Sequence, residues 1–339
     1  MTNPSQTKSK TNMLNARISG IASYVPDDIL DNEMLSQMVD TNDEWITTRV
    51  GIKERRILKL DEGSSYMGIQ AVNRLLESTG TNPEVVDLLI CATSNPDYRF
   101  PSTASVIAGG SKLSGCYAYD IQAACAGFIV ALQDANAYIK SGLYKKVVVV
   151  AAEKMSSMVN YKDRQTCPLF GDAAAAVLVE PTAEAGMGVI DAVFHVDGDG
   201  RDHLIMRAGG SAHPATVETV EAGDHYIFQD GRYVYKHAVT DMLTSTQDVM
   251  ARNNLTPADI KYLIPHQANL RIIEAVAQRA EVPMEKVLVN IEHYGNTSAA
   301  SIPLCLDEYK GLLHKGDKLV LTAFGAGFTW GAMYLVWDM

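Results

Sequence analysis

The chain repeats one pattern of helices and strands in its two halves, and this repeat limits the possible folds more than any other feature. Lys146 and Asp317 lie 171 positions apart (317 − 146), and each precedes an apolar run typical of a buried strand. At the same separation, Cys125 and Asn296 each follow a strand-like segment and precede a helical one. A regular separation of this kind indicates a duplicated unit. Helical and strand-like segments alternate within each unit, so we expect an α/β fold with mostly buried strands.

The boundaries of the expected elements follow from apolar periodicity and from capping residues. In the first half we expect strands at 18–25, 86–92, 117–121, 146–152 and 174–179, and helices at 32–39, 65–79, 101–113 and 128–140, with a short one opening at 43. In the second half we expect strands at 189–196, 260–265, 287–290 and 319–323, helices at 234–253, 268–280 and 297–310, and a final hairpin to 337. The stretches 153–168 and 197–231 are expected to be irregular.

We divide the chain into a disordered tail at 1–15, a first half at 16–185 and a second half at 186–339. The first twelve residues are polar and carry two lysines but no arginine and no apolar segment, so we do not expect a targeting segment there. No apolar run approaches the roughly 20 residues that span a bilayer.

Charge and cysteine usage exclude several classes of function. The net charge of −11 leaves no broad basic surface for nucleic acid or an anionic membrane. Five cysteines without pairing rhythm favour a reducing, cytoplasmic setting. We expect no metal site, because His203, His213 and His225 share no ligand spacing. The acidic loop 197–202 lacks the glycine and the closing glutamate of a calcium loop.

Cys125 stands where the expected strand 117–121 turns into the expected helix 128–140, among small residues that leave its sulfur accessible. A helix N-terminus favours thiolate over thiol by roughly 0.3–1 kcal/mol, which suits a nucleophile. A buried structural cysteine is the alternative, because free cysteines are among the most buried residues. The repeat favours the nucleophile, since ligands of such folds lie beyond the strand C-termini, where Asn296 is expected beside Cys125.

His266 is the histidine that ends an expected strand just before a helix, next to the same pocket. It could instead cap the helix or sit in the core, and Asn296 could be a simple N-cap. Position at a strand end favours a functional histidine, one that trades protons or donates hydrogen bonds near neutral pH.

Four motifs resemble the β-ketoacyl-acyl-carrier-protein synthase III family of the thiolase superfamily, and the likeness runs from about residue 18 to the C-terminus. They are Ala-Ala-Cys-Ala-Gly-Phe at 123–128, Pro-His-Gln-Ala-Asn at 265–269, Tyr-Gly-Asn-Thr-Ser-Ala at 294–299 and Phe-Gly-Ala-Gly-Phe-Thr-Trp-Gly at 324–331. The resemblance implies a five-layer αβαβα fold, a homodimer and fatty acid synthesis in the cytoplasm. It also implies that an acyl-coenzyme A primer and malonyl-acyl-carrier protein are the substrates and that no cofactor is needed.

The resemblance assigns roles to individual residues. Cys125 would accept the acyl group, while His266 and Asn296 would support decarboxylation of the malonyl thioester. The backbone N–H groups of Cys125 and Ala326 would form the oxyanion hole, although the family often carries glycine at the position of Ala326. The remaining assignments are Thr41, Trp45, Arg49, Arg164 and Asn269 for coenzyme A and its pantetheine arm, Phe324 and, across the dimer, Phe100 for the acyl pocket, and Lys236 and Arg271 for carrier-protein docking.

Three other functions fit parts of the sequence. The separation of 141 residues between Cys125 and His266 (266 − 125) matches the ~130–150 of papain-like hydrolases, but the flanking residues and the duplication do not. A non-catalytic partner subunit would be expected to lack one of the three residues, and none is missing. A homologue from specialised metabolism would keep the fold and transfer the acyl group to a different nucleophile.

Overall fold

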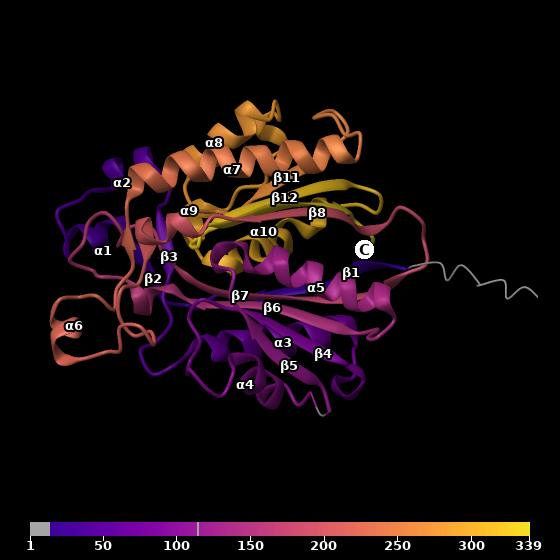
Figure 1. Ribbon diagram of the computed structural model, residues 1–339, viewed down its shortest axis with the longest axis horizontal. Coiled ribbons are helices and arrows are strands. Elements are labelled where there is room, and N and C mark those ends of the chain that lie inside the picture. Colours follow the sequence, from indigo (N-terminus) through magenta and orange to yellow (C-terminus); the bar gives the residue numbers. More distant parts are fainter. Residues whose placement is uncertain (1–13, 114) are drawn as a thin grey trace, which may run out of the picture.

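Two stacked β-sheets, separated and covered by helices, form the structure (Figure 1). The computed structural model describes residues 14–113 and 115–339. The first sheet has the order β1-β7-β6-β4-β5 and consists of β1 (Asn15–Tyr24), β4 (Leu88–Ala92), β5 (Tyr117–Ile121), β6 (Val147–Lys154) and β7 (Asp172–Thr182). The second has the order β11-β12-β13-β8 and consists of β8 (Gly188–Val196), β11 (Tyr262–Pro265), β12 (Lys318–Gly325) and β13 (Thr329–Val336).

The helices complete five layers. In Figure 1, α5 (Gly127–Ser141) and α10 (Ser301–Tyr309) lie between the sheets. The outer face of the first sheet is covered by α3 (Ser64–Thr79) and α4 (Thr103–Gly110), and that of the second by α7 (Gly231–Arg252) and α8 (Leu270–Arg279). The fold is therefore the αβαβα arrangement expected from the sequence.

Shorter elements surround one end of the layers. They are α1 (Asn32–Ser36), α2 (Asp43–Val50), α6 (Val217–Glu221), α9 (Ile291–Tyr294), and two small sheets that pair β2 (Ile29–Asp31) with β3 (Glu54–Arg56) and β9 (Leu204–Ile205) with β10 (Phe228–Gln229). The stretch 197–231, which we expected to be irregular, thus contains α6, β9 and β10.

The topology confirms the duplication and corrects its register. Strands β1, β7, β6 and β4 of the first sheet correspond in order and direction to β8, β13, β12 and β11 of the second. Matching 3₁₀ turns, η2 (Ala124–Ala126) and η6 (Ser298–Ala300), precede α5 and α10, and each begins with a residue at positive φ. These turns are 174 residues apart, so Ala299 rather than Asn296 is the counterpart of Cys125. The three additional residues let Asn296 precede the turn.

Local sequence explains the helix that carries the site. Gly142 ends α5 in the left-handed conformation, as expected for a glycine just past a helix. Both Phe128 and Leu132 are fully buried because α5 lies between two sheets. Through these buried contacts α5 packs against both halves of the chain, and this packing fixes the position of its first turn.

Two expected elements differ in the structure. The expected strand 287–290 is reduced to one isolated bridge between Val287 and Leu263, after which the chain turns into α9. The expected loop at 153–168 begins too early, because β6 continues through Glu153 and Lys154, and both are buried. Burial against neighbouring strands therefore overrides the polar character of these two residues.

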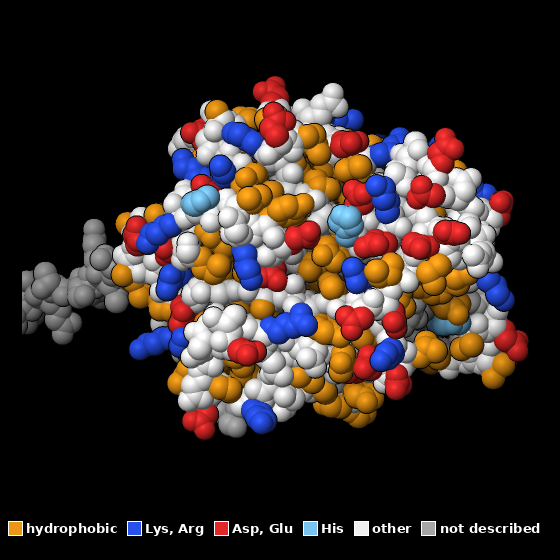
Figure 2. Space-filling view, turned by 180° about the vertical axis from the view of Figure 1, so that it is seen from behind, with side chains coloured by type: hydrophobic (Ala, Val, Ile, Leu, Met, Phe, Trp, Pro, Cys, Tyr) orange, Lys and Arg blue, Asp and Glu red, His pale blue; other side chains and the backbone are white. Residues whose placement is uncertain are grey.

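The predicted division of the chain stays a prediction, and its boundaries can be located on the elements. The connection from β7 to β8 contains the boundary between 185 and 186. Most of the expected tail lies outside the described residues, whereas Asn15 already belongs to β1. Within the described ranges, no helix has both the length and the hydropathy that crossing a membrane requires. On the face shown in Figure 2, basic and acidic side chains are interspersed.

Candidate active site

Cys125 lies in the tight turn η2, between the end of β5 and the start of α5. Ala124 before it has φ +45°, a conformation that L-residues rarely adopt and that holds the turn sharp. The residue keeps part of its surface open to a cavity of about 480 Å³. Cys125 therefore occupies the position expected for a nucleophile, in a tight turn beside a cavity.

The helix N-terminus, which is expected to favour the Cys125 thiolate, does not decide the protonation state of this side chain. Burial raises the pKa of Cys125 to about 12, although a hydrogen bond with Ser298 lowers it. The charge on the nearby Glu153 raises the pKa further. The helix N-terminus contributes only ~0.3–1 kcal/mol, which is less than one pKa unit, so burial dominates. At neutral pH the resting side chain is a thiol.

His266 follows β11 directly, and its backbone N–H donates to the carbonyl of Thr322 on β12. Its Nδ1 lies 2.7 Å from the Ser301 hydroxyl oxygen, which also accepts from the backbone N–H of Gln267 at 3.4 Å. The Ser301 hydroxyl can donate to Nδ1 or accept from it, and donation places the ring proton on Nε2, which is the tautomer that a hydrogen-bond donor toward the cavity requires. Burial lowers the pKa of His266 to about 3, so the imidazole is neutral.

The buried state of His266 predicts a pH dependence of stability. The unfolded chain binds a proton near pH 6.5 and the folded chain only near pH 3, so acid favours unfolding between these values. Relative to a His266→Gln variant, the wild type should lose roughly 2 kcal/mol of unfolding free energy from pH 7.5 to pH 5. Urea denaturation of both proteins measures this, with the exposed His314→Gln as control. An equal wild-type-to-variant difference at the two pH values would contradict the prediction.

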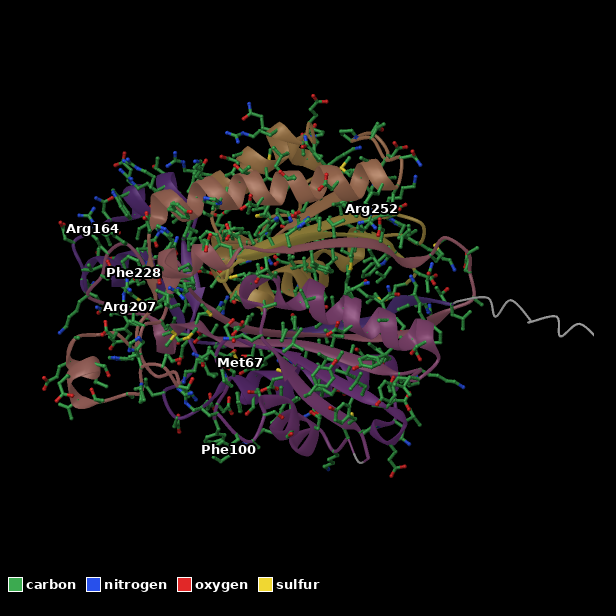
Figure 3. All side chains as sticks on the ribbon, in the orientation of Figure 1. Met67, Phe100, Arg164, Arg207, Phe228 and Arg252 are labelled. Carbon is green, nitrogen blue, oxygen red and sulfur yellow. The ribbon has the colours of Figure 1, made fainter. Side chains whose placement is uncertain are left out.

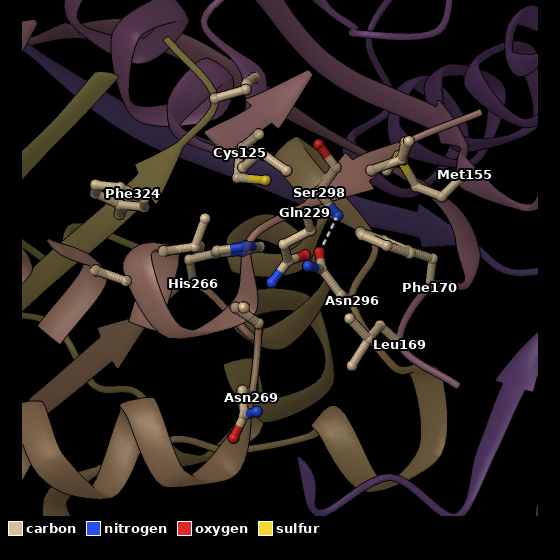
Figure 4. A pocket seen from close by; sticks show the side chains of 18 of the residues that line it. Cys125, Met155, Leu169, Phe170, Gln229, His266, Asn269, Asn296, Ser298 and Phe324 are labelled. Carbon is tan, nitrogen blue, oxygen red and sulfur yellow. Dashed lines mark hydrogen bonds between the residues drawn. The ribbon is translucent and has the colours of Figure 1, made fainter. Parts of the chain in front are cut away.

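Asn296 is held on three sides. Its backbone N–H donates to the carbonyl of Leu169, its carbonyl accepts from Gly171, and its side-chain Oδ1 accepts from the backbone N–H of Ser298 at 2.9 Å. The side chain is buried, and with Oδ1 engaged its NH₂ group faces the cavity as a donor. In Figure 4 the Cys125 sulfur, the His266 ring and the Asn296 amide point toward one space.

The same cavity collects further residues expected from the sequence, namely Asn269, Phe324 and Ala326. Asn269 caps α8 through its side chain. The turn after β12 presses against Cys125, because a Cβ at Gly325 would lie 2.6 Å from the Cys125 backbone nitrogen. The turn that contains Ala326 therefore packs against the backbone of Cys125, and both residues line the cavity.

The expected coenzyme A residues gather on elements that border the cavity, since Val50 of α2 and Gln165 line it. Trp45 lies between two guanidinium groups, with Arg49 at 5.0 Å and Arg164 at 4.9 Å from its ring centroid. Arg164 also pairs with Asp40 at 3.3 Å. The Thr41 hydroxyl is buried without a hydrogen-bond partner among the described residues.

Like the coenzyme A residues Thr41, Trp45, Arg49 and Arg164, the remaining three expected residues do not line the cavity of their own chain. Phe100 is 86% exposed and points outward near α4 (Figure 3). Lys236 and Arg271 are exposed on α7 and α8. Arg271 lies over the ring of Tyr235, which lines the cavity, so both cations are close to its mouth.

Sequence reasoning missed several residues that shape the site. Glu153 falls in the expected loop 153–168, although its position directly after six apolar residues of β6 could have indicated a buried carboxyl group. Ser298 and Ser301 gave no individual signal beyond their motif. Gln229 of β10 brings an amide into the cavity and lies between His266 and Asn296 in Figure 4. Among the described residues, no three His, Cys, Asp or Glu side chains cluster as metal ligands.

Duplicated, stacked sheets that bring a cysteine, a histidine and an asparagine to one cavity define a thiolase-fold acyltransferase. Sequence profiles described as 3-oxoacyl-[acyl-carrier-protein (ACP)] synthase III and as its C-terminal part match residues 119–198 and 250–337. The chain belongs to the β-ketoacyl-acyl-carrier-protein synthase III family.

Individual relatives span almost the whole chain. The β-ketoacyl-[acyl-carrier-protein] synthase III of Porphyromonas gingivalis is 55% identical over 327 residues, which cover 96% of this chain and 97% of that protein. Synthase III 2 of Bacteroides thetaiotaomicron is 54% identical over 325 residues, with the same coverage of both chains. The crystal structure of 3-oxoacyl-[acyl-carrier-protein] synthase III from Aquifex aeolicus is 43% identical, has a TM-score of 0.87, and covers 95% of this chain and 100% of its own.

Proposed function

We propose that this enzyme condenses an acyl-coenzyme A primer with malonyl-acyl-carrier protein, releases CO₂ and forms a 3-oxoacyl-acyl-carrier protein that initiates fatty acid synthesis. The observation that carries the proposal is the meeting of Cys125, His266 and Asn296 in one cavity. Each supplies a different group, namely a sulfur nucleophile and two uncharged hydrogen-bond donors. Membership of the family supports the same reaction.

Acyl transfer uses the sulfur of Cys125 and backbone donors. The sulfur attacks the thioester carbonyl of the primer, and the developing oxyanion is stabilised by the N–H groups of Cys125 and Ala326. Such donors are effective because they are already oriented and need no reorganisation during the reaction. The tight packing of Gly325 against Cys125 keeps the two N–H groups in place. The coenzyme A thiolate then leaves, and the acyl group stays on Cys125.

Condensation uses the two side-chain donors. Loss of CO₂ from the malonyl group places negative charge on its thioester oxygen. The Nε2–H of His266 and the amide NH₂ of Asn296 both face the cavity and can donate to that oxygen. Both donors bind this oxygen more strongly when it carries the negative charge of the enolate than when it belongs to the neutral thioester. They therefore stabilise the transition state more than the bound substrate. The enolate carbon then attacks the acyl-cysteine and releases Cys125. These steps use only the enzyme's own groups, and we propose that no cofactor takes part.

The surroundings of the cavity support the substrate assignments. Trp45 and Arg164 offer an aromatic and a cationic face for the adenine, while Arg49 is placed for phosphate. Asn269 lies on the path of the pantetheine arm. Lys236 and Arg271 give the cationic contacts for an acidic carrier protein on a chain whose net charge is −11. Thr41 completes the coenzyme A site. A cytoplasmic location fits five cysteines that are all free thiols in the structure.

We also propose a homodimer in which Phe100 limits the partner's acyl pocket. Strand β5 is the edge of its sheet and, among the described residues, pairs only with β4. Exposed aromatic side chains lie along this side, with Tyr117 at 56% and Phe100 at 86% exposure. A second copy paired along β5 would cover both the strand edge and the aromatic rings. Sedimentation velocity tests this proposal, and a monomer at micromolar concentration would refute it.

A direct assay tests the function. Purified enzyme is given a panel of acyl-coenzyme A primers, and intact-mass spectrometry should show one acyl group on Cys125. Addition of malonyl-acyl-carrier protein should discharge this adduct and yield 3-oxoacyl-acyl-carrier protein. The pocket should select among primers, because each buried methylene contributes roughly 0.8 kcal/mol. An enzyme that hydrolyses the primer without a stable adduct would instead be a thioesterase, and the proposal would be wrong.

A further inference from the structure

The thiol of Cys125 has to give up its proton for the sulfur to attack, and the structure limits which groups can accept this proton. Burial keeps the proton on the resting sulfur at neutral pH. His266 is a poor acceptor, because burial lowers its pKa to about 3 and its Nδ1 is already engaged with the Ser301 hydroxyl. Asn296 has no basic group. A base near the sulfur is therefore needed from elsewhere.

Glu153 occupies that place. It lies near the end of β6 and is completely buried. The hydroxyl of Ser298 donates to its Oε1 at 2.9 Å, and Ser298 lines the same cavity as Cys125, beside its sulfur (Figure 4). Ser94 and Thr93 also donate to the Glu153 carboxylate, through a backbone N–H at 2.9 Å and hydroxyls at 3.2 and 3.3 Å. The Ser298 hydroxyl thus connects the thiol to a carboxylate held in place by four hydrogen bonds.

We propose that Glu153 receives the proton of the Cys125 thiol through the Ser298 hydroxyl. As the sulfur attacks the primer carbonyl, the S–H proton passes to Ser298 Oγ while the Ser298 O–H proton passes to Oε1 of Glu153. The C–S bond to coenzyme A breaks, and the coenzyme A thiolate takes a proton from solvent. When the condensation product leaves, the Cys125 thiolate regains its proton from Glu153 by the reverse path. Glu153 is thus neutral while the acyl group is on the enzyme. The inference rests on the acyl-cysteine of the proposed function.

The environment of Glu153 suits this task. Burial raises the pKa of Glu153 to about 7, against the lowering effect of its hydrogen bonds, so that it changes protonation near neutral pH. The titratable groups coupled to it are Cys125 on η2 and Cys91 on β4. From β7 it is opposite the uncharged Ala173, and the neighbouring Lys154 binds the carbonyls of Lys59 and Glu62. A base whose pKa is close to the working pH is the most effective kind.

A purely supporting role for Glu153 is the alternative, because Ser298 also holds Asn296 through its backbone N–H. Two variants separate the roles. Glu153→Gln keeps the size of the side chain but removes the base. Ser298→Ala removes the hydroxyl and retains the backbone N–H that positions Asn296. Glu180→Gln is the matched control, because it makes the same side-chain change on β7, where the carboxylate pairs with Lys146 and does not line the cavity.

The experiment follows the acylation rate by rapid mixing with acetyl-coenzyme A from pH 5.5 to pH 9. In the wild type and in Glu180→Gln the rate should rise with pH and level off above an inflection near 7. In Glu153→Gln and Ser298→Ala the inflection should disappear, and the rate at pH 8 should fall roughly 10²-fold or more, as for loss of a general base. These variants should keep the wild-type melting temperature.

Other results would overturn the inference. If the inflection survives in Glu153→Gln, or if this variant acylates within about threefold of the wild type at pH 8, Glu153 does not take the proton. If acylation and condensation both fall while the inflection stays, Glu153 only positions Ser298. A wild type that forms no acyl-cysteine at all would instead refute the proposed function, so the two failures are distinguishable.

Discussion

Replacement of Cys125 by alanine should abolish acyl transfer, so that acetyl-coenzyme A leaves no adduct on the protein. The reason is that the sulfur is the nucleophile in the cavity and forms the bond to the primer. Condensation should fall by at least roughly 10⁴-fold, because removal of a nucleophile eliminates the covalent route and leaves only binding and the oxyanion hole. Intact-mass spectrometry and product formation measure the two effects.

The same variant should still decarboxylate malonyl-acyl-carrier protein. His266 and Asn296 remain in place, and neither makes its positioning contacts through the Cys125 side chain. Folding should be unaffected, because Ala124 and Ala126 already flank the position in the same turn. Cys116→Ala, outside the cavity, is the matched control and should acylate normally. An acyl adduct on Cys125→Ala would show that another residue is the nucleophile.

The parts of the fold that could be predicted are those fixed by local patterns. Strand β5 has the expected bounds, and α5 ends at Gly142 as expected, because apolar runs and a left-handed glycine act within a few residues. The strand expected at 287–290 depends on partners instead, and only Val287 finds one. The register of the duplication was displaced by three residues because a turn such as η6 leaves no clear mark in the sequence.

The residues of the site likewise divide into those that the sequence could predict and those that it could not. Cys125, His266 and Asn296 could be predicted because each follows an apolar segment and lies in a motif, and the structure brings them to one cavity. The burial of Glu153 is indicated by the apolar run before it, but its significance could not be predicted, since it comes from Ser298, which is 145 positions away in the chain. The protonation state of Cys125 could not be predicted for a related reason. The helix terminus is visible in the sequence, whereas the surrounding protein that raises the pKa of Cys125 is assembled only by the fold.

Replacement of Asn296 by alanine should separate the two halves of the reaction. Acylation of Cys125 should stay within about threefold of the wild type, because its oxyanion is bound by the backbone N–H groups of Cys125 and Ala326. Condensation should fall roughly 10²–10³-fold, the usual effect of removing one donor from a developing oxyanion. His266 remains and accounts for the residual rate. Intact mass after acetyl-coenzyme A and the rate of 3-oxoacyl product measure the two steps separately.

A second variant separates the loss of the NH₂ donor of Asn296 from the loss of its contact with Ser298. In Asn296→Ala the backbone N–H of Ser298 loses its acceptor, whereas Asn296→Asp keeps an acceptor oxygen and removes only the NH₂ donor. Both variants should therefore acylate and fail to condense, and Asn296→Asp should be the weaker in condensation, because its carboxylate faces the negative enolate. Asn73→Ala, on the exposed side of α3, should behave as the wild type in both steps. If Asn296→Ala lost acylation as completely as Cys125→Ala, Asn296 would belong to the first step, and the assignment of the side-chain donors to the enolate would be wrong.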